Sequence, residues 1–278
     1  MTSLLPFRWH LIELLVIGVS TAGLVSVIGP WRQRRLALYA MAALALATLW
    51  PLGDLAASVS LTAATVQRLL IMLLVAPLLL LSLPVETLAR LTRPAGLDAL
   101  TRRLAHPGFA IAVVTVVGTA TLSTPIVDWG ARSSLGRAIV LLVVLVVGVI
   151  LWLPALRLLP GTRHLSPMAR AGYVFVSSLV VTSLSFVWIF ARHPLYPALH
   201  HQLAILHMTP LFDQQLAGFV SKFGAYAPMW GIAFVIFSRA EDDGTAIEET
   251  PLHWADVERE MLRIDRLRTR QRRRAEQS

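Results

Sequence analysis

The chain has 278 residues, of which 56% are hydrophobic and 15% are charged, and it contains no cysteine. A soluble domain carries about 25% charged residues, so the composition departs from the soluble average and indicates a membrane protein. The missing cysteine excludes disulfides and thiolate metal ligands. We interpret the formal net charge of +9 as charge that sets membrane topology rather than as a nucleic-acid-binding surface.

Seven apolar stretches follow one another along the chain. They are Leu11–Gly29, Leu36–Leu52, Val66–Leu83, Pro107–Thr124, Ala138–Leu156, Tyr173–Phe190 and Leu216–Phe237. Most approach the roughly 20 residues that cross a bilayer as helix. Lipid offers no partners for backbone groups, and the apolar runs do not alternate as barrel strands do. We therefore predict an all-α, polytopic integral membrane protein with seven transmembrane helices.

The arginines are distributed unequally between the two predicted sides of the membrane. If the seven stretches cross in turn, 19 of the 24 arginines fall in the first, third and fifth loops and in the tail. The positive-inside rule then predicts that the amino terminus lies outside and the carboxyl terminus in the cytoplasm. The fourth stretch is the weakest, and losing it would break the alternation, so the arginines themselves favour seven spans.

The end of the chain differs in composition from the rest. We divide the sequence into a transmembrane domain, residues 1–239, and a cytoplasmic segment, residues 240–278. Within that segment, acidic Glu241–Glu249 is predicted as a linker, and Pro251 suits the first position of an amphipathic helix. The basic run Arg268–Arg274 predicts attraction to anionic lipid, at about 1 kcal/mol per charge near the surface.

Four charged residues lie within or at the ends of the apolar stretches: Glu13, Arg68, Asp213 and Lys222. The predicted topology places all four in the outer half of the membrane. Charges in such positions are costly, and they mark either ion pairs or functional sites. Both interpretations stay open here: paired helices, or a polar pocket that opens to the outer face.

The segment before the last stretch is rich in histidine. His200 and His207 are seven residues apart and share a helix face, with His201 and Met208 beside them. Imidazole and thioether are copper ligands, and the thioether favours the reduced ion. The alternative is an amphipathic surface helix whose histidines meet water.

Asp213, Gln214 and Gln215 are consecutive polar residues at the start of the last stretch. A helix cap explains Asp213, and side-chain amides bond to neighbouring helices. Leu216, Ala217 and Gly218 follow, and the small residues allow close helix packing.

The sequence DQQLAG at Asp213–Gly218 resembles the signature of the CtaG-type (caa3-type) cytochrome c oxidase assembly factors. Further similar pieces follow the family's order: APLLLLSLP at Ala76–Pro84, LWLPAL at Leu151–Leu156, HPLYP at His193–Pro197 and HWADVEREMLRIDR at His253–Arg266. The resemblance extends from about Trp9 to Arg266.

This resemblance implies a seven-span protein of the bacterial plasma membrane that is not an enzyme. It implies a chaperone role in respiratory-chain assembly, with copper delivered to the haem–copper oxidase from the outer face and oxidase subunits as partners. It assigns the functional surface to Asp213, Gln214, Gln215 and Gly218.

The chain departs from the family at the expected copper ligands. The family's H-x-x-Q-H becomes Ala64 to Arg68, with only Gln67 retained, and no histidine occurs around Gly136–Ile139. Arginine cannot release its proton to bind a cation, and its fixed charge repels copper.

Two hypotheses follow from this departure. Either copper ligands come from His200, His201, His207 and Met208, or copper binding is lost and the protein is an assembly scaffold. In the second case, ion pairs such as Glu13–Arg68 or Asp213–Lys222 replace the metal.

No phosphate loop, nucleophile elbow or HExxH motif occurs. The alternative to an assembly factor is a small-solute or ion transporter whose path is lined by Glu13, Arg68, Asp213 and Lys222. Against transport, the inner half of the predicted bundle lacks charged residues within the spans, whereas a proton relay needs deeper stations.

Overall fold

The structure is a computed structural model that describes residues 11–156, 158, 165–199 and 206–248. Within those ranges the backbone forms helices and no strand, which confirms the all-α class. The chain divides into two compact units, Met1–Ile236 and Phe237–Ser278. The site considered below lies in the first unit.

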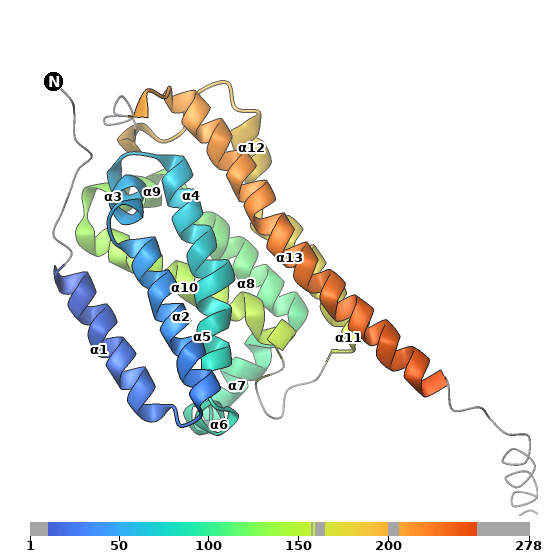
Figure 1. The fold of residues 1–278 in the computed structure, drawn as a ribbon. Helices are drawn as coiled ribbons and strands as arrows, with labels where there is room; N and C mark the ends of the chain where they lie inside the picture. Colours follow the sequence, from blue (N-terminus) through green and yellow to red (C-terminus); the bar gives the residue numbers. More distant parts are fainter. Residues whose placement is uncertain (1–10, 157, 159–164, 200–205, 249–278) are drawn as a thin grey trace, which may run out of the picture. The chain divides into compact units, whose positions relative to one another are not determined.

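Figure 1 shows the helices in chain order. They are α1 (Leu11–Val27), α2 (Trp31–Thr48), α3 (Leu52–Ser58), α4 (Leu61–Leu70), the π-helical turn η1 (Ile71–Val75), α5 (Ala76–Ser82), α6 (Val85–Leu91), α7 (Ala95–Leu104), α8 (Pro107–Ala120), α9 (Thr124–Arg132), α10 (Ser134–Leu156), α11 (Pro167–Val181), α12 (Ser185–Ile189), the 3₁₀ turn η2 (Pro197–Leu199) and α13 (Pro210–Glu248).

The described helices make the chain a multi-pass membrane protein. Four helical runs are long and apolar enough to cross a bilayer: Leu61–Ser82, Ser134–Leu156, Pro167–Ile189 and Pro210–Arg239. Two bent pairs raise the number to six if each crosses once, α2 with α3 at 47° and α7 with α8 at 86°. The apolar part of α1, Leu14–Ser26, is shorter. Seven spans and the orientation of the termini therefore stay predictions.

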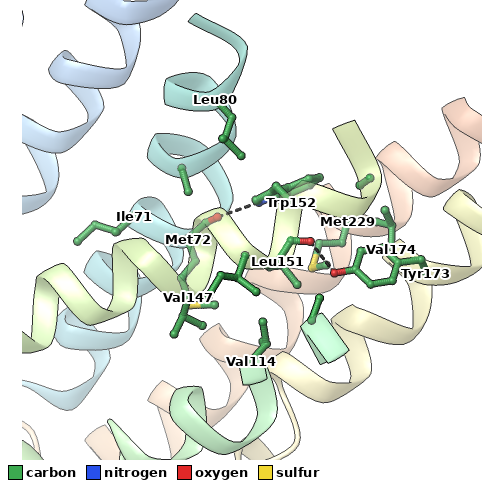
Figure 2. Packing of buried hydrophobic residues seen from close by; sticks show 14 of the residues in the cluster. Ile71, Met72, Leu80, Val114, Val147, Leu151, Trp152, Tyr173, Val174 and Met229 are labelled. Atoms are coloured by element: carbon green, nitrogen blue, oxygen red, sulfur yellow. Dashed lines mark hydrogen bonds between the residues drawn. The ribbon is translucent and has the colours of Figure 1, made fainter. Parts of the chain in front are cut away.

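Helix α10 lies at the centre of the first unit, in contact with α5, η1, α8, α9 and α11. Its Gly148 permits a close approach, because a Cβ atom there would lie 2.9 Å from the Cα atom of Met72. The surrounding core is formed by buried side chains such as Val147, Leu151 and Trp152 (Figure 2). Small and branched residues thus fix the packing of α10 against the helix that contains η1.

The π-helical turn η1 provides the backbone carbonyl that Trp152 binds. The Ala76 N–H donates to the Ile71 carbonyl, five residues back. In that register Pro77 would be the next donor, but proline has no N–H. The Trp152 indole Nε1 instead donates to the Met72 carbonyl at 2.9 Å, as Figure 2 shows. The tryptophan of LWLPAL therefore satisfies a buried backbone oxygen.

The described part of the predicted linker Glu241–Glu249 is helical, because α13 continues to Glu248, and its role as a linker stays a prediction. This segment contains alanine and glutamate with a single glycine, and extending an existing helix avoids the cost of nucleation. The remaining tail, residues 249–278, lies outside the described residues. Its basic helix and its contact with anionic lipid stay predictions.

Candidate functional site

The start of α13 is joined to the start of α4 by the Asp213 carboxylate. Its Oδ1 accepts hydrogen bonds from Ser60 Oγ at 2.6 Å and from the Thr62 N–H at 3.2 Å, and its Oδ2 accepts from the Leu61 N–H at 2.6 Å. Asp213 is 1% exposed. A carboxylate at a helix N-terminus satisfies unpaired N–H groups and interacts favourably with the helix dipole. Asp213 therefore caps a helix that lies about 150 residues away in sequence.

Ser60 completes this cap from the α4 side. Its Oγ also accepts from the Ala63 N–H at 3.2 Å, as an N-cap serine does. The Thr62 hydroxyl donates to the Asp213 carbonyl at 2.9 Å. Side chains of both helices thus bind the backbone of the other, which fixes their spacing and register.

Gln214 and Gln215 hold the extended segment between α12 and η2. Gln214 is 2% exposed, and its Oε1 accepts from the Leu195 N–H at 2.7 Å, while its Nε2 lies 3.5 Å from the His193 carbonyl. Gln215 Nε2 donates to the Ala191 carbonyl at 3.4 Å. We call Asp213, Gln214, Gln215 and these partners the DQQ clamp. It ties α4, α13 and the 191–196 segment together.

The small residues after the clamp allow α13 to approach α12. A Cβ atom on Gly218 would lie 2.9 Å from the Ser185 carbonyl oxygen and 2.7 Å from Ile189 Cγ1. Ala217 is fully buried beside Trp188. Such contacts are typical of close helix pairs in membranes.

Tyr196 links the clamped segment to the end of α8. Its hydroxyl donates to the Leu122 carbonyl at 2.7 Å and accepts from Trp188 Nε1 at 3.0 Å. The two rings pack edge to face at 83°. Burial raises the pKa of Tyr196, so the hydroxyl stays protonated and keeps its donor role.

The DQQ clamp is therefore buried inside the first unit, and its polar atoms bind other parts of the same chain. Sequence reasoning expected Asp213 to cap the helix it begins, whereas the carboxylate caps α4. It missed Ser60 and Thr62. The N-cap pattern of Ser60 ahead of an apolar run was visible, but its partner lies too far along the chain for a local pattern to identify.

Arg68 and Lys222 have partners that the sequence analysis did not predict. Arg68 donates from Nη1 to Thr121 Oγ1 at 2.6 Å and from Nη2 to the Gly118 carbonyl at 2.9 Å. Lys222 Nζ lies 3.5 Å from the Phe186 ring centroid, which is a cation–π contact.

No ion pair joins Asp213 to Lys222, because the carboxylate is directed to α4. The Glu13 side chain lies outside the described residues, so its pairing with Arg68 stays a prediction.

The predicted outer copper ligands are only partly described. His200 and His201 lie outside the described residues. His207 is exposed and has a left-handed backbone with φ of 52°, and Met208 is half-buried. Within the described ranges, no group of three or more histidine, cysteine or acidic residues could hold a metal ion.

The other candidate copper position, near the start of α4, is a cavity of about 100 Å³. Ala64 and Arg68 line it from α4, and Arg137 lines it from α10. These are the stretches where the resemblance places metal-binding histidines. A methyl group and two guanidinium groups offer no lone pair to a cation. The residues present therefore do not fit copper.

The comparison with protein families agrees with these features. The family model described as cytochrome c oxidase caa3 assembly factor, Caa3_CtaG, matches residues 17–241. This range includes the DQQ clamp, the Trp152 contact and the cavity. No curated protein sequence and no solved structure matches the chain. The chain belongs to the CtaG family of cytochrome c oxidase caa3 assembly factors.

Proposed function

We propose that this protein is a non-catalytic assembly factor of a haem–copper cytochrome c oxidase in the bacterial plasma membrane. The observation that carries the proposal is the family match over residues 17–241. The four long apolar helices support a membrane location. Oxidase subunits are the partners that this role requires.

We also propose that it acts as a scaffold, through protein contacts rather than by holding copper beside α4. Arg68 supports this choice, because it has no lone pair for a metal and repels cations. Copper delivery from the outer face remains the alternative within the same biological role. It would depend on His200, His201, His207 and Met208, of which exposed His207 is favourable.

The arginine distribution supports an orientation with the amino terminus outside and the tail in the cytoplasm. In that orientation the DQQ clamp belongs to the outer half of the membrane. Transport through the charged residues is less well supported, because Asp213 is buried and accepts three hydrogen bonds.

A deletion strain tests the assembly role. We expect loss of assembled oxidase, measured by its haem absorbance and its oxygen consumption, and restoration by the wild-type chain. Asp213→Ala at matched membrane abundance should restore less oxidase than Asp98→Ala, a control in an exposed ion pair on α7. Normal oxidase in the deletion strain would refute the proposal.

Copper measurements then distinguish an assembly scaffold from a copper carrier. The scaffold proposal predicts that His207→Ala/Met208→Ala restores oxidase fully and that added copper does not rescue the deletion. Stoichiometric Cu(I) in the purified protein that disappears in this double variant would instead establish the outer-loop carrier.

A further inference from the structure

Helix α7 runs nearly at a right angle to α8, the helix that follows it. The two axes differ by 86°. Helix α8 has no charged residue in its 14 positions, and it packs against α10 and α11, which belong to candidate membrane spans. An apolar helix of this kind belongs in the hydrocarbon layer of the bilayer. A helix perpendicular to it therefore lies along the membrane surface.

The apolar side chains of α7 gather on one face. Leu97, Leu100 and Leu104 are three and four residues apart, so they lie above one another on the helix. Leu104 packs against the core of the bundle, whereas Leu97 and Leu100 are 47% and 48% exposed. The leucine face thus begins at the bundle and continues past it. Its two outer members are directed toward the layer that surrounds the bundle, which is lipid.

The remaining surface of α7 is basic. Arg102 pairs with Asp98 at 2.8 Å. Arg103 is exposed, borders the leucine face three residues after Leu100, and forms no ion pair with any residue that the structure describes. Over Val85–Leu104 the chain carries four arginines and two acidic residues. The charged side chains keep α7 out of the hydrocarbon interior, and the excess of arginine favours a negatively charged surface.

We infer that α7 is an interfacial helix that binds anionic phospholipid, with Leu97 and Leu100 among the acyl chains and Arg103 at the phosphate groups. Leucines on one face and arginines on the other are typical of helices that lie in the membrane interface. Exposed leucines alone would also fit a partner protein, but the right angle to α8 and the arginine beside the leucines fit a bilayer surface. This lipid contact is independent of the proposed oxidase role and of the basic tail.

Spin labels measure the depth of α7 in the bilayer. The chain has no cysteine, so one introduced cysteine carries the label at a defined position. In bilayers of phosphatidylcholine and phosphatidylglycerol, labels on Leu97→Cys and Leu100→Cys should be accessible to oxygen and shielded from a water-soluble nickel chelate. A label on Ala99→Cys, an exposed position on another face of α7, should show the reverse. Equal accessibility to the chelate at all three positions, whether high or low, would overturn the proposal.

Brominated lipids measure the preference for negative headgroups. A fluorophore on Leu100→Cys should be quenched more by brominated phosphatidylglycerol than by brominated phosphatidylcholine, with a relative association constant of about five or more. Arg103→Gln should lower this constant about fivefold, because one charge near the anionic surface is lost. Arg132→Gln should leave it unchanged, since Arg132 belongs to an exposed ion pair on α9, beyond the other end of α8.

Thermal unfolding of both arginine variants in the same bilayers provides the control for folding, and equal Tm values are expected because both side chains are exposed. Equal quenching by the two brominated lipids would overturn the proposal. A preference for phosphatidylglycerol that survives Arg103→Gln unchanged would do so too, because the anionic lipid would then be held by another part of the chain.

Discussion

Asp213 binds the first residues of α4, and Arg68 lies in α4 itself about two helical turns further on; the two differ in how completely their charges are satisfied. The Asp213 carboxylate accepts three hydrogen bonds at the helix start and is 1% exposed. The Arg68 guanidinium donates two bonds and faces a cavity. The first arrangement pairs both carboxylate oxygens, whereas the second leaves guanidinium donors that bind no described residue.

The difference shows that a charge in an apolar helix bundle has no single meaning. A buried carboxylate with every oxygen paired is part of the fold, and removing it leaves unpaired donors behind. A buried cation with spare donors adds little to stability. Mutations at the two positions should therefore change the free energy of unfolding by different amounts.

The largest effect is expected for Asp213→Ala. Ser60 and two N–H groups of α4 would lose their acceptor while buried, so unfolding should become easier by about 3 kcal/mol or more. Thermal unfolding in detergent measures this. Asp98→Ala, which breaks an exposed i,i+4 pair, should change the free energy by less than about 0.5 kcal/mol. Equal losses in the two variants would contradict the clamp.

Gly218→Ala comes next, because the added methyl group would meet the Ser185 carbonyl oxygen and Ile189. Overpacking of this kind costs about 1–3 kcal/mol. Gly231→Ala in the same helix has nothing within 4 Å of the new Cβ and should be neutral or stabilising by up to about 1 kcal/mol. Chemical denaturation of both variants checks the pair, and a loss for Gly231→Ala as large as that for Gly218→Ala would disprove close packing at Gly218.

Substitutions of the two glutamines in the clamp should differ in their effect on stability. Gln214→Ala removes a buried acceptor 2.7 Å from the Leu195 N–H and should cost about 1–2 kcal/mol. Gln215→Ala removes a longer bond of 3.4 Å from a half-buried residue and should cost about 0.5 kcal/mol. Limited proteolysis near Ala191 provides a local measurement, with faster cleavage expected for Gln214→Ala. The reverse order would mean that Gln215 holds the 191–196 segment more firmly than Gln214 does.

The positions of the helices could largely be predicted from the sequence, because each depends on a local apolar run. The ends of the helices were predicted less well. The 47° bend lies at residues 49–51, near the end of the second predicted span, and the 86° bend at residues 105–106, just before the fourth. Hydropathy averaged over a window does not detect such bends. The continuation of α13 to Glu248 was missed because acidic composition was taken to end a helix.

The site could be read only in part. DQQLAG identified the residues of the clamp and the family, but not their partners, since Asp213 and Ser60 are 153 positions apart. The same limit produced the predicted Asp213–Lys222 pair: opposite charges near one another in sequence suggested a bond, whereas α4 supplies stronger N–H donors. A polar pocket that includes Arg68 was one of the two interpretations kept open, but its other walls were not predicted, because they come from α3, α9 and α10.

Arg68→Met should have the smallest effect on stability, which makes it the sharpest test of the contrast with Asp213. Losing Arg68 leaves few groups unpaired, because the Gly118 carbonyl still accepts from Thr121 Oγ1 at 2.7 Å. Removing a buried charge that forms no ion pair with the described residues also offsets the two lost bonds, so the free energy of unfolding should change by less than about 1 kcal/mol. Thermal unfolding measures this, side by side with Asp213→Ala. A loss as large as that of Asp213→Ala would mean that Arg68 holds α4 to α8 as firmly as the clamp holds α4 to α13.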